Sequence, residues 1–220
     1  MGHGDETPEA VSRGATDYCH MNGTRFLFLG WMILLAAAPG SAGHAGEQAK
    51  AVFAGGCFWC MEEAFEKVEG VVSVTSGYMG GFKPDPTYEE VSAGNTGHAE
   101  SVEVVYDPAK VSYQKLLDHF WKNVDPLTPN AQFCDHGSQY RAVIFFGNEE
   151  EKRQAEASKH AIEQSKRFKE PIVTQIVMAS KFFPAEDYHQ DFYKKNPIRY
   201  KFYKTSCGRV NRLEQLWGKS

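Results

Sequence analysis

The stretch "AGGCFWCMEEAF" (residues 54–65) places two cysteines three positions apart, directly after two glycines and around a Phe-Trp pair. Apolar side chains then recur at i, i+3, i+4 and i+7, which predicts one face of a helix that begins near Cys57. Those side chains are Met61, Ala64, Phe65 and Val68. A CxxC at a helix start fits a zinc site, a disulfide-exchange motif or a nucleophilic cysteine in an aromatic pocket.

The segments on either side of this helix alternate between strand and helix patterns. We expect strands at 51–54, 71–79, 98–107, 141–147 and 171–179, and further helices at 112–123 and 148–166. Two strands are consecutive in the middle of this order. The pattern predicts an α+β two-layer sandwich with a ferredoxin-like βαββαβ-type core, helices on one face and a long irregular C-terminal tail.

Composition restricts the class of protein. The chain has 220 residues, of which 42% are hydrophobic and 13% aromatic, enough for one sizeable core. The net charge of −4 gives no general case for nucleic acid. Five cysteines are too few for a disulfide scaffold of this length.

The first 45 residues differ from the rest of the chain. Residues 21–45 hold a basic Arg25, an uncharged apolar run at 26–38, a Pro-Gly break and small residues, which is the pattern of a secretory signal peptide. The run is too short for a permanent membrane span, although a retained anchor is the alternative. We expect residues 1–20 to be a non-native upstream extension and residues 46–220 to be one exported domain, periplasmic or secreted, without stable membrane insertion.

The first cysteine of the motif has the position of a nucleophile. A helix N-terminus favours the thiolate, so we expect the pKa of Cys57 to be lowered. Cys60 lies one turn into the helix and should have the higher pKa. Phe58 and Trp59 then border the sulfur.

Strand 98–107 adds a candidate acid. Its residues alternate so that Glu100 shares a face with Val102 and Val104, and that face should be the buried one. A carboxyl in apolar surroundings has a raised pKa and holds a proton near neutrality. A buried glutamate with a structural partner is the alternative.

Five motifs together resemble the peptide methionine sulfoxide reductase A family, over roughly residues 51–200. They are "GCFWC" (56–60), "GYMGG" (77–81), "PTYEEV" (86–91), "GHAESVEVVYDP" (97–108) and "FCDHGSQYR" (133–141). The resemblance implies thiol-dependent reduction of free or peptide-bound methionine-S-sulfoxide, and hence repair of oxidised exported proteins. It implies no cofactor and no metal, and a thioredoxin-like reductant. We expect the chain to be a monomer.

The resemblance also assigns roles. Cys57 attacks the sulfoxide sulfur and becomes a sulfenic acid, Glu100 protonates the sulfoxide oxygen, and Tyr88 and Tyr140 donate hydrogen bonds to that oxygen. Phe58 and Trp59 hold the S-methyl group, and Asp135 meets the substrate backbone.

The chain departs from the family at the second thiol. Many relatives have glycine at the position of Cys60 and two cysteines in a glycine-rich C-terminus, whereas this tail has only Cys207. Both Cys207 and Cys60 are candidates to resolve the sulfenic acid into a disulfide. We favour Cys207, because the family commonly resolves through its C-terminal segment. We expect Cys134 to be a small packed residue, and a tail tyrosine found in some members has no secure counterpart.

Four other interpretations remain open. The four cysteines from 57 to 207 can form two structural disulfides or a zinc site. A thioredoxin-like disulfide oxidoreductase is the nearest enzymatic rival. The basic and aromatic residues of 194–212 resemble a nucleic-acid-binding arm, although neither the overall charge nor export favours that function.

Overall fold

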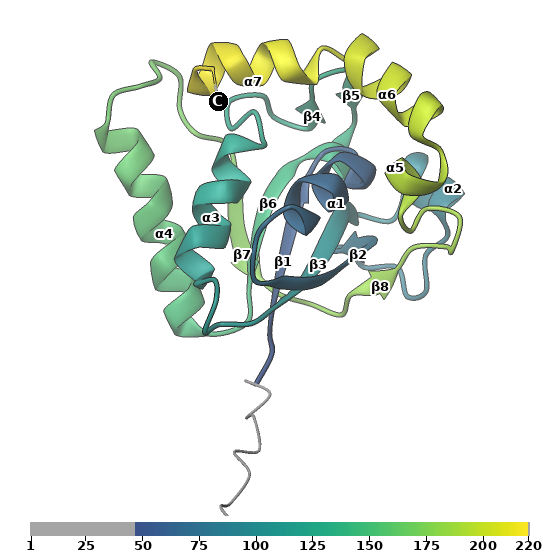
Figure 1. Ribbon diagram of the computed structural model, residues 1–220, viewed down its shortest axis with the longest axis horizontal. Coiled ribbons are helices and arrows are strands. Elements are labelled where there is room, and N and C mark those ends of the chain that lie inside the picture. The colour runs from purple at the N-terminus through teal and green to yellow at the C-terminus, as the bar shows by residue number, and fades with distance from the viewer. Residues whose placement is uncertain (1–46, 220) are drawn as a thin grey trace, which may run out of the picture. The chain divides into compact units, whose positions relative to one another are not determined.

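The computed structural model describes residues 47–219 (Figure 1). The predicted extension at 1–20 and signal peptide at 21–45 lie outside the described residues. Within the described range, no helix has both the length and the apolar composition needed to cross a bilayer.

A six-stranded sheet forms the centre of the domain, in the order β7-β6-β1-β3-β2-β8. Neighbouring strands are antiparallel except β6 and β7, which are parallel. The strands are β1 (Ala49–Gly55), β2 (Val71–Met79), β3 (Ala99–Tyr106), β6 (Ala142–Phe146), β7 (Gln175–Met178) and β8 (Phe183–Pro184). A separate two-stranded hairpin consists of β4 (Ala131–Gln132) and β5 (Asp135–His136).

Seven α-helices and one 3-10 helix are present in the described part of the chain. They are α1 (Phe58–Glu66), α2 (Tyr88–Ser92), α3 (Tyr113–Lys122), η1 (Ser138–Tyr140), α4 (Glu149–Gln164), α5 (Phe192–Lys195), α6 (Pro197–Ser206) and α7 (Arg209–Trp217). Figure 1 shows α1 and α3 lying across the sheet, and α6 and α7 along one end of the domain. The prediction of a mixed helix and strand fold is confirmed.

The larger hydrophobic core lies between the sheet and helices α1 and α3. Alternation along β1 sends Phe53 into this core and its neighbours Val52 and Ala54 into a smaller cluster on the opposite face. Phe53 is fully buried and stacks on Phe65 of α1 and Phe120 of α3, with ring centroids 4.9 Å and 5.3 Å apart. Removing such a ring costs about 3–5 kcal/mol of stability.

The two glycines before Cys57 make the sharp turn from β1 into α1. Gly56 has φ +80°, a conformation that side chains strain, and a Cβ there would lie 2.4 Å from Cβ of Gln132. Glycine is therefore required at this point. The turn ends the strand and puts Cys57 at the N-cap of the helix.

The prediction of an irregular C-terminal tail was wrong, because the tail is mostly helical. Pro197 starts α6 at a position where its missing N–H is not needed. Gly208, in the left-handed conformation, then joins α6 to α7. Most of the lysines and arginines that obscured the pattern are exposed or half-buried, while Arg209, Tyr200 and Leu216 are buried.

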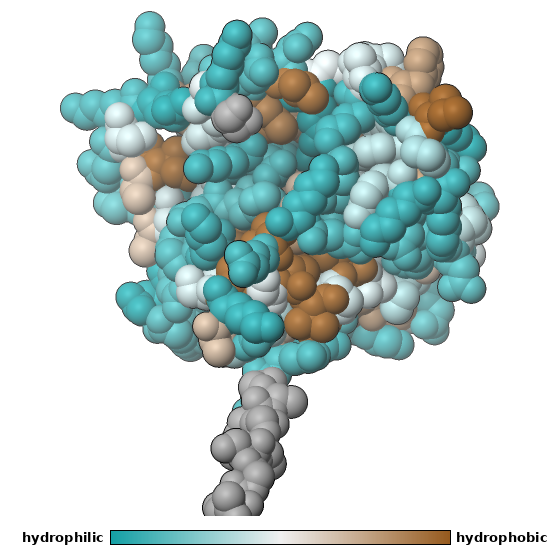
Figure 2. Space-filling view, in the orientation of Figure 1, coloured by the Kyte–Doolittle hydropathy of each residue, from teal (hydrophilic) through white to brown (hydrophobic). Residues whose placement is uncertain are grey.

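The prediction of a strong last strand at 171–179 holds only in part. The segment forms β7 over Gln175–Met178, with mostly exposed side chains, and β8 follows it. β7 lies at the edge of the sheet and pairs with β6 alone, through Gln175–Met178, so only part of the apolar run forms the strand. Figure 2 shows hydrophilic residues over most of the viewed face, with hydrophobic residues gathered in smaller patches.

Candidate active site

Two cysteines with buried sulfurs lie at the start of α1. Cys57 is the N-cap, and its carbonyl oxygen accepts hydrogen bonds from the amide nitrogens of Cys60 (3.1 Å) and Met61 (3.3 Å). Cys57 and Cys60 are 6% and 3% exposed, and neither is in a disulfide. Their side chains hydrogen-bond to one another. The helix turn therefore places the two thiols in direct contact.

Glu100 points inward from β3, as the alternation of that strand predicted. Its Oε2 accepts a hydrogen bond from the backbone N–H of Phe58 at 3.0 Å, so the carboxyl group lies at the N-terminus of α1 beside Cys57. Burial raises the pKa of Glu100 to about 8, although the Phe58 hydrogen bond acts in the opposite direction. Glu100 is therefore a protonated acid at neutral pH.

The hydroxyls of Tyr88 and Tyr140 both respond to the charges of Glu100 and Cys57. Tyr88 opens α2, whose start is fixed by a capping box between Thr87 and Glu90. Tyr140 ends η1. Burial and then the charge of Glu100 raise the pKa of both tyrosines, and Cys57 adds to both shifts. Both hydroxyls thus stay protonated and able to donate hydrogen bonds.

The two aromatic side chains of the CxxC form a wall beside the thiols. Phe58 is buried, with its ring centroid 5.9 Å from that of Tyr78. Trp59 stacks on Phe192 of α5 with centroids 3.7 Å apart, and its indole N–H donates to Nδ1 of His189 at 3.1 Å. The sequence predicted the aromatic wall but not Phe192 or His189, which come from a segment 130 residues away.

Helix α6 covers the cysteines with two tyrosines. The Tyr203 hydroxyl donates to Oδ2 of Asp135 and also hydrogen-bonds Cys57. The Tyr200 hydroxyl donates to Glu63 of α1 and hydrogen-bonds Cys60. Sequence reasoning missed this pair. Its signal was two tyrosines three positions apart in a basic tail, the spacing of one helical face.

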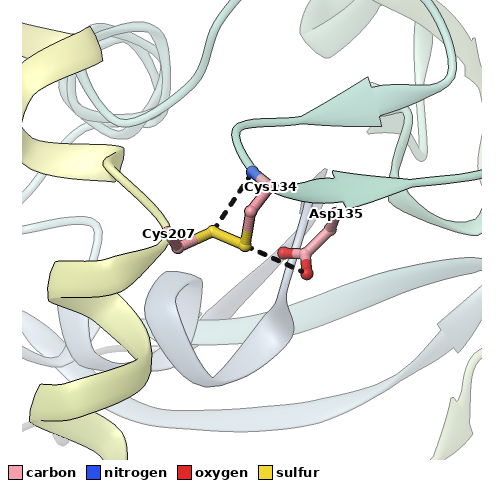
Figure 3. Close-up of side chains that lie close together, drawn as sticks. All are labelled: Cys134, Asp135 and Cys207. Carbon is pink, nitrogen blue, oxygen red and sulfur yellow. Dashed lines mark hydrogen bonds between the residues drawn. A yellow bond between two sulfur atoms is a disulfide. The ribbon is translucent and has the colours of Figure 1, made fainter.

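A disulfide fastens this helix to the β4–β5 hairpin (Figure 3). Cys134 and Cys207 are bonded across 73 residues, with Cα atoms 4.9 Å apart. The prediction that Cys134 is a small packed residue was wrong, because it is exposed at the hairpin. The bond also rules out a zinc site made by all four cysteines, since Cys134 and Cys207 hold no thiolate for a metal.

The disulfide bears on the choice of resolving thiol. Cys207 is joined to Cys134 and not to Cys57, whereas Cys60 contacts Cys57 directly. Asp135, next to Cys134, is held by Tyr203 close to the same site. The structure therefore brings Cys57, Cys60, Glu100 and Asp135 together and leaves Cys207 in a bond at the rim.

The pKa values of the two thiols differ from the order expected from the helix N-terminus, which predicted the lower pKa for Cys57. Burial raises the pKa of Cys57, and the hydrogen bond with Cys60 adds to that shift. The hydrogen bond from Cys57 lowers the pKa of Cys60 to about 6 against the effect of burial, with help from Arg209. Arg209 is buried and donates to the backbone oxygens of Gly55 and Asn123, and the described residues include no carboxylate paired with it. These effects favour the thiolate form of Cys60 over that of Cys57.

A buried thiol pair beside a protonated carboxylic acid and two tyrosine hydroxyls defines a thiol-dependent oxidoreductase. The sequence model of the peptide methionine sulfoxide reductase family matches residues 49–220. Peptide methionine sulfoxide reductases MsrA of Listeria innocua and Bacillus subtilis are each 49% identical over 168 residues, which is 76% of this chain and 95% of each relative. The chain belongs to the peptide methionine sulfoxide reductase family.

Solved structures agree with this assignment. Methionine sulfoxide reductase A of Corynebacterium diphtheriae matches with a TM-score of 0.64 and 33% identity, over 70% of this chain and 77% of that one. Reduced Mxr1 from Saccharomyces cerevisiae matches with a TM-score of 0.65 and 30% identity, over 69% and 87%. The chain is an oxidoreductase that reduces methionine sulfoxide.

Proposed function

We propose that the chain reduces the S-epimer of methionine sulfoxide, free or in peptides, with Cys57 as the nucleophile and Glu100 as the acid. The observation that carries the proposal is the contact of the Glu100 carboxyl with the N-terminus of the helix that holds Cys57. Sulfoxide oxygen leaves poorly until it is protonated. An acid with a pKa of about 8, beside an attacking sulfur, meets that need.

In the first step, the Cys57 sulfur attacks the sulfoxide sulfur, and Cys57 passes its proton to the Cys60 thiolate. Glu100 gives its proton to the sulfoxide oxygen, while Tyr88 and Tyr140 donate hydrogen bonds to it. The oxygen then transfers from the methionine sulfur to the Cys57 sulfur: the new sulfur–sulfur bond and the methionine sulfur–oxygen bond break, and a Cys57 sulfur–oxygen bond forms. Methionine leaves, and Cys57 is a sulfenic acid. Phe58 and Trp59 enclose the S-methyl group, and Asp135 binds the substrate backbone after Tyr203 releases it.

In the second step, Cys60 resolves the sulfenic acid. Its sulfur attacks the Cys57 sulfur, a Cys57–Cys60 disulfide forms, and hydroxide leaves as water with the proton of Cys60. Cys60 is favoured over Cys207 because it already touches Cys57, and because its lowered pKa makes it the better attacking thiol near neutrality.

A stereospecific assay tests the reaction. Purified protein with dithiothreitol should reduce methionine-S-sulfoxide and leave the R-epimer untouched, as measured by chiral amino-acid analysis. A thioredoxin-like disulfide oxidoreductase would instead reduce insulin disulfides and leave both sulfoxides unchanged, and that result would overturn the proposal.

We propose also that a thioredoxin-like protein serves as reductant and that the chain acts as a monomer. Resemblance to the family supports the thioredoxin-like reductant. Coupled turnover with a thioredoxin-like protein and sedimentation of the purified chain test the two parts separately.

Export is a further part of the proposal. The signal-peptide pattern of residues 21–45 supports it, and so does the disulfide between Cys134 and Cys207, a bond typical of oxidising compartments. The enzyme would then repair oxidised exported proteins. N-terminal sequencing of the exported product decides this, and a full-length product found only in the cytosol would contradict it.

For the fold, we propose that the four central strands form a ferredoxin-like core. The antiparallel order β6-β1-β3-β2 and the α1 and α3 crossovers between these strands support that description.

A further inference from the structure

A cavity of about 920 Å³ lies between α1, α3, α4 and the C-terminal helices α6 and α7, and it reaches Cys60. Its size is that of a small-molecule site. Cys60 is a lining residue, but Cys57 is not. The cavity therefore approaches the thiol pair from the Cys60 side.

The cavity carries an excess of positive charge. Seven lysine and arginine side chains line it, against three carboxylates. Glu63, one of the carboxylates, is already shared between Lys67 and Lys204. Lys115 and Lys122 of α3 make no ion pair within residues 47–219, and Arg209 is bonded to backbone oxygens near Cys60. The interior thus favours an anionic ligand.

We propose that this cavity binds low-molecular-weight thiols that carry carboxylates, and that these thiols reduce the oxidised enzyme by attacking Cys60. The inference rests on the proposed function, because it requires a Cys57–Cys60 disulfide. The site goes beyond a thioredoxin-like reductant: a cavity of this volume accepts a small thiol but not a protein.

The chemistry follows from which of the two cysteines lines the cavity. A thiolate attacks one sulfur of a disulfide and expels the other, through a mixed disulfide. Attack from the cavity forms a bond between the small thiol and Cys60, and the Cys57–Cys60 bond breaks. Cys57 leaves as a thiolate, takes a proton and is ready for substrate. A second small thiolate then attacks the sulfur of the small molecule in this mixed disulfide. The attack releases a small-molecule disulfide and restores the Cys60 thiolate.

The test measures reduction of the Cys57–Cys60 disulfide, formed beforehand with diamide, by mercaptosuccinate and by neutral 2-mercaptoethanol. Acid quenching, alkylation and peptide mapping follow this disulfide separately from Cys134–Cys207. In a Lys115→Glu, Lys122→Glu double variant, we expect mercaptosuccinate to react about tenfold more slowly than in wild type at low salt. The 2-mercaptoethanol rate should stay within about twofold, since that thiol carries no charge.

A matched control is Lys201→Glu, because this exposed lysine of α6 does not line the cavity. It should leave both rates unchanged. Comparing each variant with wild type for the same thiol cancels the intrinsic reactivities of the two thiols. Trapped intermediates should carry mercaptosuccinate on Cys60. Equal slowing of both thiols, or an adduct on Cys57, overturns the inference. Neither measurement requires sulfoxide turnover, so failure here is distinct from failure of the proposed function.

Discussion

The backbone nitrogen of Phe58 lies 3.0 Å from Oε2 of Glu100, so the proposed acid and the proposed nucleophile, Cys57, are held by the same helix turn. β3 supplies the carboxyl group and the β1–α1 turn supplies the thiol. Their separation is therefore set by the sheet and does not depend on a loop.

Replacement of the nucleophile should abolish the reaction. A neutral hydroxyl cannot replace sulfur in attack on a sulfoxide, so Cys57→Ser should reduce no methionine-S-sulfoxide. The measurement is methionine release in the presence of dithiothreitol, and Cys134→Ser, which leaves both thiols of α1 in place, is the control. Turnover by Cys57→Ser above a few per cent of wild type would contradict the assignment.

Replacement of the acid should separate activity from stability. In Glu100→Gln the amide can accept the Phe58 hydrogen bond but cannot deliver a proton, so the rate should fall by roughly 10²–10⁴-fold. Because the pKa of Glu100 is about 8 when folded and 4.5 when exposed, folding loses stability as pH rises between these values. Glu100→Gln should therefore have a free energy of unfolding up to roughly 3 kcal/mol higher than wild type at pH 7, measured by urea unfolding. A wild-type rate in this variant would make the glutamate purely structural.

The pH dependence should show two limbs. In the proposed mechanism, reduction needs Cys60 as thiolate, with a pKa of about 6, and Glu100 protonated, with a pKa of about 8. The single-turnover rate should therefore rise with pH near 6 and fall near 8. Stopped-flow measurement across pH 5 to 10 checks this. In Glu100→Gln the upper limb should disappear, and its persistence would assign that limb to another group.

The Cys134–Cys207 disulfide should support the fold and not the chemistry. A Cys134→Ala, Cys207→Ala double variant should lose about 2–4 kcal/mol of unfolding free energy, because the bond closes a long loop. Turnover with dithiothreitol should continue, with weaker substrate binding where Asp135 is less well positioned. Complete loss of turnover in a variant that remains folded would show that one of these cysteines is needed for catalysis.

The local motifs could be predicted from sequence because their signals are local. The helix after Gly56, the inward direction of Glu100 and the aromatic pair at 58–59 all follow from spacing and alternation within a few residues. The pattern also predicted the central strands and the crossover helices, since apolar residues dominate there.

The remaining features depend on contacts between distant segments. Tyr203 meets Asp135 across 68 residues, and Cys134 meets Cys207 across 73, and no local pattern reports either pairing. The pKa order of the two thiols also depends on such contacts, because Arg209 and Tyr200 come from the tail. A helix N-terminus alone favoured Cys57 as the thiolate. Burial instead disfavours the Cys57 thiolate, and the hydrogen bond from Cys57 together with the tail cations favours the thiolate of Cys60.

Peptide mapping after one turnover tests the central claim most directly. Protein with Cys57 and Cys60 reduced is mixed with methionine-S-sulfoxide without reductant, then quenched with acid and alkylated. We expect one methionine per chain and a new Cys57–Cys60 disulfide, with Cys60→Ala leaving a Cys57 sulfenic acid that dimedone traps. A Cys57–Cys207 crosslink, or methionine release without any change at Cys57, would contradict the account.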